Sequence, residues 1–157
     1  ELLTDRVRVL GPDHPDTLTT RHNLAGYKAE LGQVEQAVAE LAELLTERIR
    51  VQGKDHPETL NTRHNLARWR AELGQIDQSV AEYEELLTDR VRVLGPDHPD
   101  TLATRSNLAG GRGSLGRADL AVAEYQRLLP DLVRVLGPDH PDTLAIRNNL
   151  AYWRRRN

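Results

Sequence analysis

The sequence GPDHPDTL occupies residues 11–18 and decides how the chain is organised, because it recurs at a fixed interval. It returns as GKDHPETL at 53–60, and as GPDHPDTL at 95–102 and again at 137–144. Each copy begins 42 residues after the previous one. A fixed period of this length is typical of solenoid proteins, in which each unit buries its apolar face only against its neighbours.

Each unit carries the pattern of two helices. Pro15 follows Asp13 and His14 and suits the first turn of a helix, where a preceding polar residue can cap free N–H groups. Gly32 ends this first helix, and Gly53 lies just past the second. The apolar residues fall at helical spacing, with Leu18, Leu24, Ala25 and Leu31 on the first helix and Val34, Val38, Leu41, Leu45 and Ile49 on the second. No segment shows the alternation of a strand, so no sheet is expected.

We therefore predict an all-α fold, a right-handed solenoid of stacked antiparallel helix pairs that forms one array over residues 1–157. In this prediction residues 1–10 are half of a second helix, 11–52, 53–94 and 95–136 are full repeats, and 137–157 are a first helix without its partner. We expect a fragment of a longer protein, since the chain begins with Glu1 rather than Met. The apolar side chains expected to be exposed at its ends are Leu2, Leu3, Val7 and Leu10, and then Leu144, Leu150 and Trp153.

The composition excludes several functional classes. The 157 residues include 21 basic and 24 acidic side chains, whereas a general nucleic-acid binder needs a dominant basic surface. The chain has no Cys, which excludes disulfides, thiolate metal sites and cysteine nucleophiles. No apolar run has the length of a membrane span and no signal-like segment is present, so we expect a cytoplasmic protein without membrane contact.

We expect no metal, cofactor or catalytic activity. Each Asp-His-Pro motif supplies a single His, and successive copies lie a whole repeat apart, too far to share an ion, so helix capping is the better interpretation. No nucleophile–base arrangement or catalytic carboxylate pair stands out. The run Gly110-Gly111-Arg112-Gly113 has no strand before it and so is not a phosphate-binding loop.

Several residues resemble the tetratricopeptide repeat (TPR) pattern, namely Asn23-Leu24-Ala25, Gly32, Val34, Ala37, Leu41 and Leu44. The small residue where the family's two helices cross is matched by Ala37, Ser79 and Ala121. The 42-residue period is similar to the kinesin-light-chain subtype, and bacterial, notably actinobacterial, regulators carry similar arrays, often behind a STAND-type ATPase module. The sequence departs from the family at its first-helix aromatic, where the nearest column is Tyr27, Trp69, Gly111 and Trp153.

The resemblance implies a binding groove lined by the first helices. The family's peptide-binding asparagine matches Asn23, Asn65, Asn107 and Asn149, and an Asn amide can bind the main chain of an extended peptide. The further candidates are His22, His64, Arg68 and Tyr152, beside groove positions such as Ala103, Ser106 and Ala145. The basic candidates, with Arg155 and Arg156, favour an acidic segment or a free carboxylate. The alternative for the asparagines is an intramolecular hydrogen bond.

We predict a non-catalytic protein–protein interaction scaffold that binds a peptide or partner protein in this groove, as part of a larger regulatory protein. The alternative is a structural spacer or a self-assembly module that stacks end to end into homo-oligomers through exposed terminal helices. An engineered consensus array is a further origin, although Ser106, Gly111 and Pro130 are irregularities that a designer would usually remove.

Two other features have competing interpretations. Hairpin arithmetic pairs Arg21, Arg63, Arg105 and Arg147 with Asp5, Glu47, Asp89 and Asp131 in a ladder between repeats, whereas the alternative is exposure to water or pairing with Glu43 and Glu85. In the third repeat, residues unfavourable to helices are Gly110, Gly111, Gly113 and Pro130. They indicate either a pocket with a flexible joint or, as we prefer, a drifting unit that its neighbours stabilise.

Overall fold

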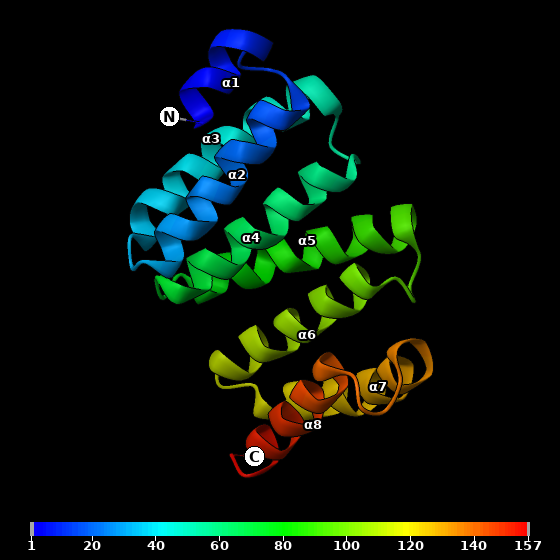
Figure 1. The fold of residues 1–157 in the computed structure, drawn as a ribbon. Coiled ribbons are helices and arrows are strands. Elements are labelled where there is room, and N and C mark those ends of the chain that lie inside the picture. Colours follow the sequence, from blue (N-terminus) through cyan, green and yellow to red (C-terminus); the bar gives the residue numbers. More distant parts are fainter. Residues whose placement is uncertain (1, 157) are drawn as a thin grey trace. The chain divides into compact units, whose positions relative to one another are not determined.

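The computed structural model describes residues 2–156, which form α-helices and no strand, and this confirms the predicted all-α class (Figure 1). The helices are α1 (Leu2–Leu10), α2 (Pro15–Glu30), α3 (Val34–Gln52), α4 (Pro57–Glu72), α5 (Ile76–Leu94), α6 (Pro99–Ser114), α7 (Ala118–Leu136) and α8 (Pro141–Arg154). They belong to two compact units, unit 1 (Glu1–Gln75) and unit 2 (Ile76–Asn157). The single array with the repeat bounds given above stays a prediction.

Within each unit, helices that follow one another in sequence pack side by side as antiparallel neighbours (Figure 1). In unit 1, α2 packs against α1, α3 and α4, and α3 also packs against α4. In unit 2, α6 packs against α5, α7 and α8, and α7 also packs against α8. Alternate helices, α2 with α4 and α6 with α8, therefore lie next to each other and can line a groove.

Local chemistry sets both ends of these helices. His14 precedes α2, and its Nδ1 atom accepts a hydrogen bond from the Asp16 N–H at 3.2 Å, with Pro15 at the first helical position. The same cap recurs at His56, His98 and His140, with distances of 3.1 to 3.2 Å. Gly32 and Gly53 follow α2 and α3 with φ of 84° and 89°, in the left-handed region that favours glycine. These features bear out the capping interpretation of the Asp-His-Pro motifs.

Each unit has its own core of small and aliphatic side chains. The buried cluster in unit 1 consists of Leu18, Ala25, Ala29, Ala37, Leu41, Leu44, Leu66 and Trp69. The cluster in unit 2 consists of Leu102, Ala109, Ala121, Tyr125, Leu128, Leu132, Ile146 and Leu150. The small residues predicted at helix crossings, Ala37, Ser79 and Ala121, are all buried.

The predicted apolar stripe of α3 is wrong at its C-terminal end. Ile49 is 45% exposed, whereas the neighbouring Arg48 is fully buried. Its Nη1 atom lies 3.1 Å from Oε2 of Glu58, in the first turn of α4. Arg90 lies at the same position of α5 and donates to the Asp100 carbonyl at 2.8 Å and to the Thr104 hydroxyl at 2.7 Å. An arginine thus links the end of a second helix to the start of the next first helix.

The predicted arginine ladder pairs the wrong helices. Arg21 forms its ion pair with Glu47 of α3, and Asp5 instead lies 3.5 Å from Arg8 on its own helix. Arg105 likewise contacts Asp131 of α7, at 2.8 Å. Counting from a turn gives the level of a residue along the helix axis, but it does not give the direction in which the side chain points. These arginines therefore join the two helices of one hairpin.

The prediction for the C-terminal end is partly wrong. Leu144 is exposed as expected, but Leu150 is only 6% exposed, because it faces the unit 2 core. Trp153 is half-buried and packs against the same core. At the other end Leu2, Val7 and Leu10 are exposed, as expected, whereas Leu3 is half-buried.

The glycines of α6 have a packing role that neither sequence interpretation anticipated. A Cβ atom on Gly113 would lie 2.6 Å from the Trp153 ring, and one on Gly111 would lie 2.7 Å from Val80. The helix is nevertheless continuous, and so is α7 through the exposed Pro130. These glycines allow α5 and α8 to approach α6 closely.

Candidate functional site

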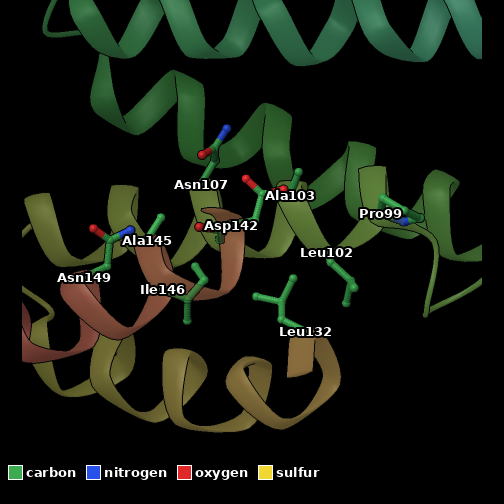
Figure 2. A pocket seen from close by; sticks show the side chains of 10 residues that line it. Pro99, Leu102, Ala103, Asn107, Leu132, Asp142, Ala145, Ile146 and Asn149 are labelled. Carbon is green, nitrogen blue, oxygen red and sulfur yellow. The ribbon is translucent and has the colours of Figure 1, made fainter. Parts of the chain in front are cut away.

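A pocket of about 280 Å³ lies between α6 and α8 in unit 2 (Figure 2). Its lining residues are Pro99, Leu102, Ala103, Ser106 and Asn107 from α6, Asp142, Ala145, Ile146 and Asn149 from α8, and Leu132 from α7. The pocket therefore lies on the surface between first helices, where the sequence predicts a groove. It brings together two candidate site residues, Asn107 and Asn149.

The pocket has an apolar floor and polar walls. Leu102, Leu132 and Ile146 gather on the side nearest α7 and are at most 3% exposed (Figure 2). The amides of Asn107 and Asn149 come from two different helices that border the pocket (Figure 2). Such a combination, an apolar surface with a few fixed polar groups, is typical of ligand sites.

Two buried tyrosines hold the asparagine side chains in place. The Tyr83 hydroxyl accepts a hydrogen bond from Nδ2 of Asn107 at 3.0 Å. The Tyr125 hydroxyl donates to the Ser106 carbonyl at 3.0 Å and is hydrogen-bonded to the Asn149 side chain. Burial raises the pKa of Tyr125, although its hydrogen bonds oppose this shift, so the phenol stays protonated and keeps its donor. Sequence reasoning missed both tyrosines, although their 42-residue spacing was a usable signal.

At the equivalent surface of unit 1, a side chain of the protein itself bridges α2 and α4. The Nδ1 atom of His22 lies 3.2 Å from the Thr62 hydroxyl, and its Nε2 atom lies 2.8 Å from Nδ2 of Asn65. Burial lowers the pKa of His22, and the positive charge of Arg48 lowers it further. The negative charge of Glu58 raises the pKa, but by less than the other two effects lower it. His22 is therefore a neutral ring fixed inside the groove.

Four other candidates, Asn23, His64, Arg68 and Tyr152, are not among the residues that line the unit 2 pocket. Asn23 is exposed on α2, and the guanidinium of the exposed Arg68 lies 4.6 Å from the centre of the Trp69 ring. Tyr152 is 39% exposed and carries Arg156 over its ring at 4.2 Å. His64 is half-buried on α4. Asn23, His64 and Arg68 belong to unit 1, and Tyr152 is the one of the four that lies in unit 2.

The charge of the pocket differs from the cationic groove expected from the sequence. The one charged residue among those that line it is Asp142. Its carboxylate is largely exposed and lies 3.7 Å from the cap residue His140, which makes an ion pair only if protonated. Basic side chains such as Arg68 and Arg156 lie instead over aromatic rings.

Among residues 2–156, no group of three or more His, Asp or Glu side chains could hold a metal ion. None of the described helices combines the length and the apolar character that crossing a membrane requires.

A family profile described as tetratricopeptide repeat matches residues 23–88 and 70–130. The chain belongs to the tetratricopeptide repeat family. Domains of this family are generally protein-interaction scaffolds and are usually non-catalytic. This confirms the resemblance drawn from the repeat residues. A search of curated proteins finds no match.

Solved structures similar to this TPR chain include proteins of the kinesin-light-chain type. Two structures of a Podosopora anserina protein with nearly identical TPR-like repeats, one of them a variant, are 27% identical, with TM-scores of 0.79 and 0.78. Each alignment covers 98% of this chain and 72% of the other. BtubC (BKLC) from P. vanneervenii is 19% identical over 90% of this chain and 57% of its own, with a TM-score of 0.80. The fold is thus a TPR-like solenoid of antiparallel helices, and no comparison supports the actinobacterial regulator context.

Proposed function

We propose that this TPR domain binds an extended segment of a partner protein in the groove between α6 and α8, without catalysing a reaction. The observation that carries the proposal is the pocket that presents Asn107 and Asn149 together on an apolar floor. Amide side chains offer donors and an acceptor to a peptide main chain, whatever side chains the peptide has. The other predicted binding residues, Asn23, Asn65, His22, His64, Arg68 and Tyr152, remain candidates for additional contacts.

The groove of unit 1 is the weaker candidate. The imidazole of His22 lies there on Thr62 and Asn65, so a ligand would first have to displace it. Breaking these hydrogen bonds costs free energy that the ligand must supply. We therefore expect unit 2 to carry most of the affinity.

Selection from a random library of displayed seven-residue peptides tests the proposal. The wild-type protein should enrich a set of related peptides, and Asn107→Ala with Asn149→Ala should weaken their binding at least about tenfold, because two amide contacts are lost. Asn23→Ala is the matched control, since Asn23 is exposed and outside the pocket. Equal binding by the double variant and the control would contradict the proposal, provided that circular dichroism shows that both are folded.

End-to-end self-association is a second candidate, supported by the exposed apolar residues Leu2, Val7 and Leu10 of α1. Light scattering over a range of protein concentrations tests it. A molar mass that rises with concentration, and that Val7→Lys holds at the monomer value, is the expected result of such stacking. A constant monomer mass for the wild type would contradict it.

We further propose that the domain is part of a larger regulatory protein.

A further inference from the structure

Six of the ten residues that line the unit 2 pocket differ from those at the equivalent positions of unit 1, and three of these differences remove the large or polar side chains that bridge the unit 1 groove. At the positions two repeats later in the chain, Ser106 corresponds to His22, Leu132 to Arg48 and Ile146 to Thr62. Each pair occupies the same position in its own unit, on the first, second and following first helix. The unit 1 residues form a polar set in which His22 contacts Thr62 across the groove, whereas the unit 2 residues are small or apolar.

Where leucine replaces the arginine, the threonine that would contact the arginine is also replaced, by isoleucine. In α5 and α6 the buried Arg90 donates to the Thr104 hydroxyl at 2.7 Å. At the same positions of α7 and α8 the chain has Leu132 and Ile146, both at most 3% exposed. A leucine beside the threonine would leave its hydroxyl only the bond to its own helix, as Thr104 has to the Asp100 carbonyl, so changing both residues together removes a buried hydroxyl that has lost one partner. The result is an aliphatic floor where the equivalent pairs Arg6–Thr20 and Arg90–Thr104 are hydrogen-bonded.

The loss of the arginine also changes the charge at the rim. In unit 1 the carboxylate of Glu58 lies 3.1 Å from the guanidinium of Arg48. Asp142 occupies the equivalent position on α8, but Leu132 offers it no positive charge. The pocket thus combines an apolar floor with a carboxylate that a cation from outside could approach.

We propose that this pocket binds a leucine-sized aliphatic side chain of an extended peptide, with a basic residue beside it facing Asp142. The proposal rests on the peptide-binding function proposed above and specifies its ligand. The volume of about 280 Å³ lies at the lower edge of pockets for drug-sized molecules and exceeds the ~150 Å³ that holds a benzene ring. It therefore suits one large side chain. The Asn149 amide is positioned for the peptide main chain, as Asn65 is for the His22 ring.

Nuclear magnetic resonance with defined probes tests this ligand. The probes are the blocked hexapeptide acetyl-Ser-Gly-Leu-Arg-Gly-Ser-amide and two versions of it, one with Ala for Leu and one with Glu for Arg. The first should shift the methyl signals of Leu132 and Ile146 and the side-chain amide signals of Asn149. The Ala version should bind at least about tenfold more weakly, because less apolar surface is buried. The Glu version should also bind more weakly, and added salt should reduce the difference.

Two variants close the pocket in ways that the protein already uses. Leu132→Arg with Ile146→Thr rebuilds the pair seen at Arg90 and Thr104, and Ser106→His supplies the ring seen at His22. Both should stay folded and lose at least about tenfold in affinity for the leucine peptide. If the first variant fails to fold, the second still decides the result.

The outcomes separate this inference from the proposed function. If the peptides shift the Asn149 amide signals equally whether they carry Leu or Ala, or if the closed variants bind as well as wild type, the aliphatic pocket is wrong and peptide binding stands. If no peptide shifts the Asn107, Asn149 or pocket methyl signals, both are wrong. Methyl signals that change with protein concentration alone would show a second copy as the occupant and would overturn the inference.

Discussion

At the scale of single residues, His22 links the groove of unit 1 to proton binding. Burial and the charge of Arg48 lower its pKa below the ordinary value of 6.5, and Glu58 only partly opposes them. Between the lowered pKa and 6.5 the unfolded chain therefore binds more protons than the folded one. Stability that depends on neutral His22 is thus fully present above pH 6.5 and is lost as the pH falls through this window.

Replacing His22 by serine, the residue that unit 2 has at this position, isolates this effect. The free energy of unfolding of the wild type, measured with urea between about pH 5 and pH 7.5, should rise more steeply with pH than that of His22→Ser. The other histidines are common to both proteins, so the difference between the two slopes belongs to His22. Identical slopes would contradict a lowered pKa at this residue.

The glycines of α6 and α2 give a second test at the residue scale. Gly113→Ala should destabilise the protein by about 1–3 kcal/mol, because the added Cβ would overlap the Trp153 ring. Gly26→Ala is the matched change in α2, where nothing lies within 4 Å of the new atom. It should stabilise by up to about 1 kcal/mol through helix propensity. Chemical denaturation measures both, and a stabilising Gly113→Ala would show that α8 does not pack as described.

At the scale of helices, the contact between a second helix and the following first helix has two chemical forms in this chain. It is polar between α3 and α4, and aliphatic between α7 and α8. Arg48 is fully buried, and its Nε and Nη2 atoms have no hydrogen-bond partner. Arg48→Leu with Thr62→Ile copies the aliphatic pair found at Leu132 and Ile146. Well-packed apolar replacements of buried ionic groups are often neutral or stabilising by about 1–4 kcal/mol. We therefore expect the denaturation midpoint to stay or to rise, and a fall of more than about 1 kcal/mol in unfolding free energy would contradict this description of the link.

The arrangement of helices was largely predictable from the sequence, because it depends on local signals. Proline after His14 and glycine at 32 and 53 mark helix ends through backbone chemistry that acts within a few residues. The 42-residue period further predicted that the helices form antiparallel pairs, and it indicated the resemblance to the TPR family. The all-α class and the small buried residues at helix crossings follow from the same patterns.

The errors arise where the direction of a side chain matters. Apolar periodicity favoured Ile49 for the core and had no means to predict that Arg48 is buried there. Counting along the helices put Asp5 level with Arg21, but packing turned Arg21 toward Glu47. The asparagines were found by resemblance, whereas the pocket depends on Leu132 and Ile146 acting together. Comparing the four repeats column by column would have shown that pair, which is a signal that a search for single motifs does not use.

At the scale of the whole molecule, unit 1 and unit 2 share one repeat pattern but present different grooves. In unit 1 the groove contains His22, and in unit 2 it is an open pocket between α6 and α8. A near-identical repeat can therefore keep its fold while a few substitutions open a pocket. We therefore expect partner binding at one part of the chain, the pocket of unit 2.

Hydrogen–deuterium exchange along the whole chain, with and without a peptide selected from the displayed library, tests this claim most directly. The peptide should slow exchange in the pocket-lining parts of α6 and α8, residues 99–107 and 142–149, and should leave the equivalent residues of α2 and α4 unchanged. Slower exchange in α2 and α4 alone, or no change in α6 and α8 at a saturating peptide concentration, would contradict it.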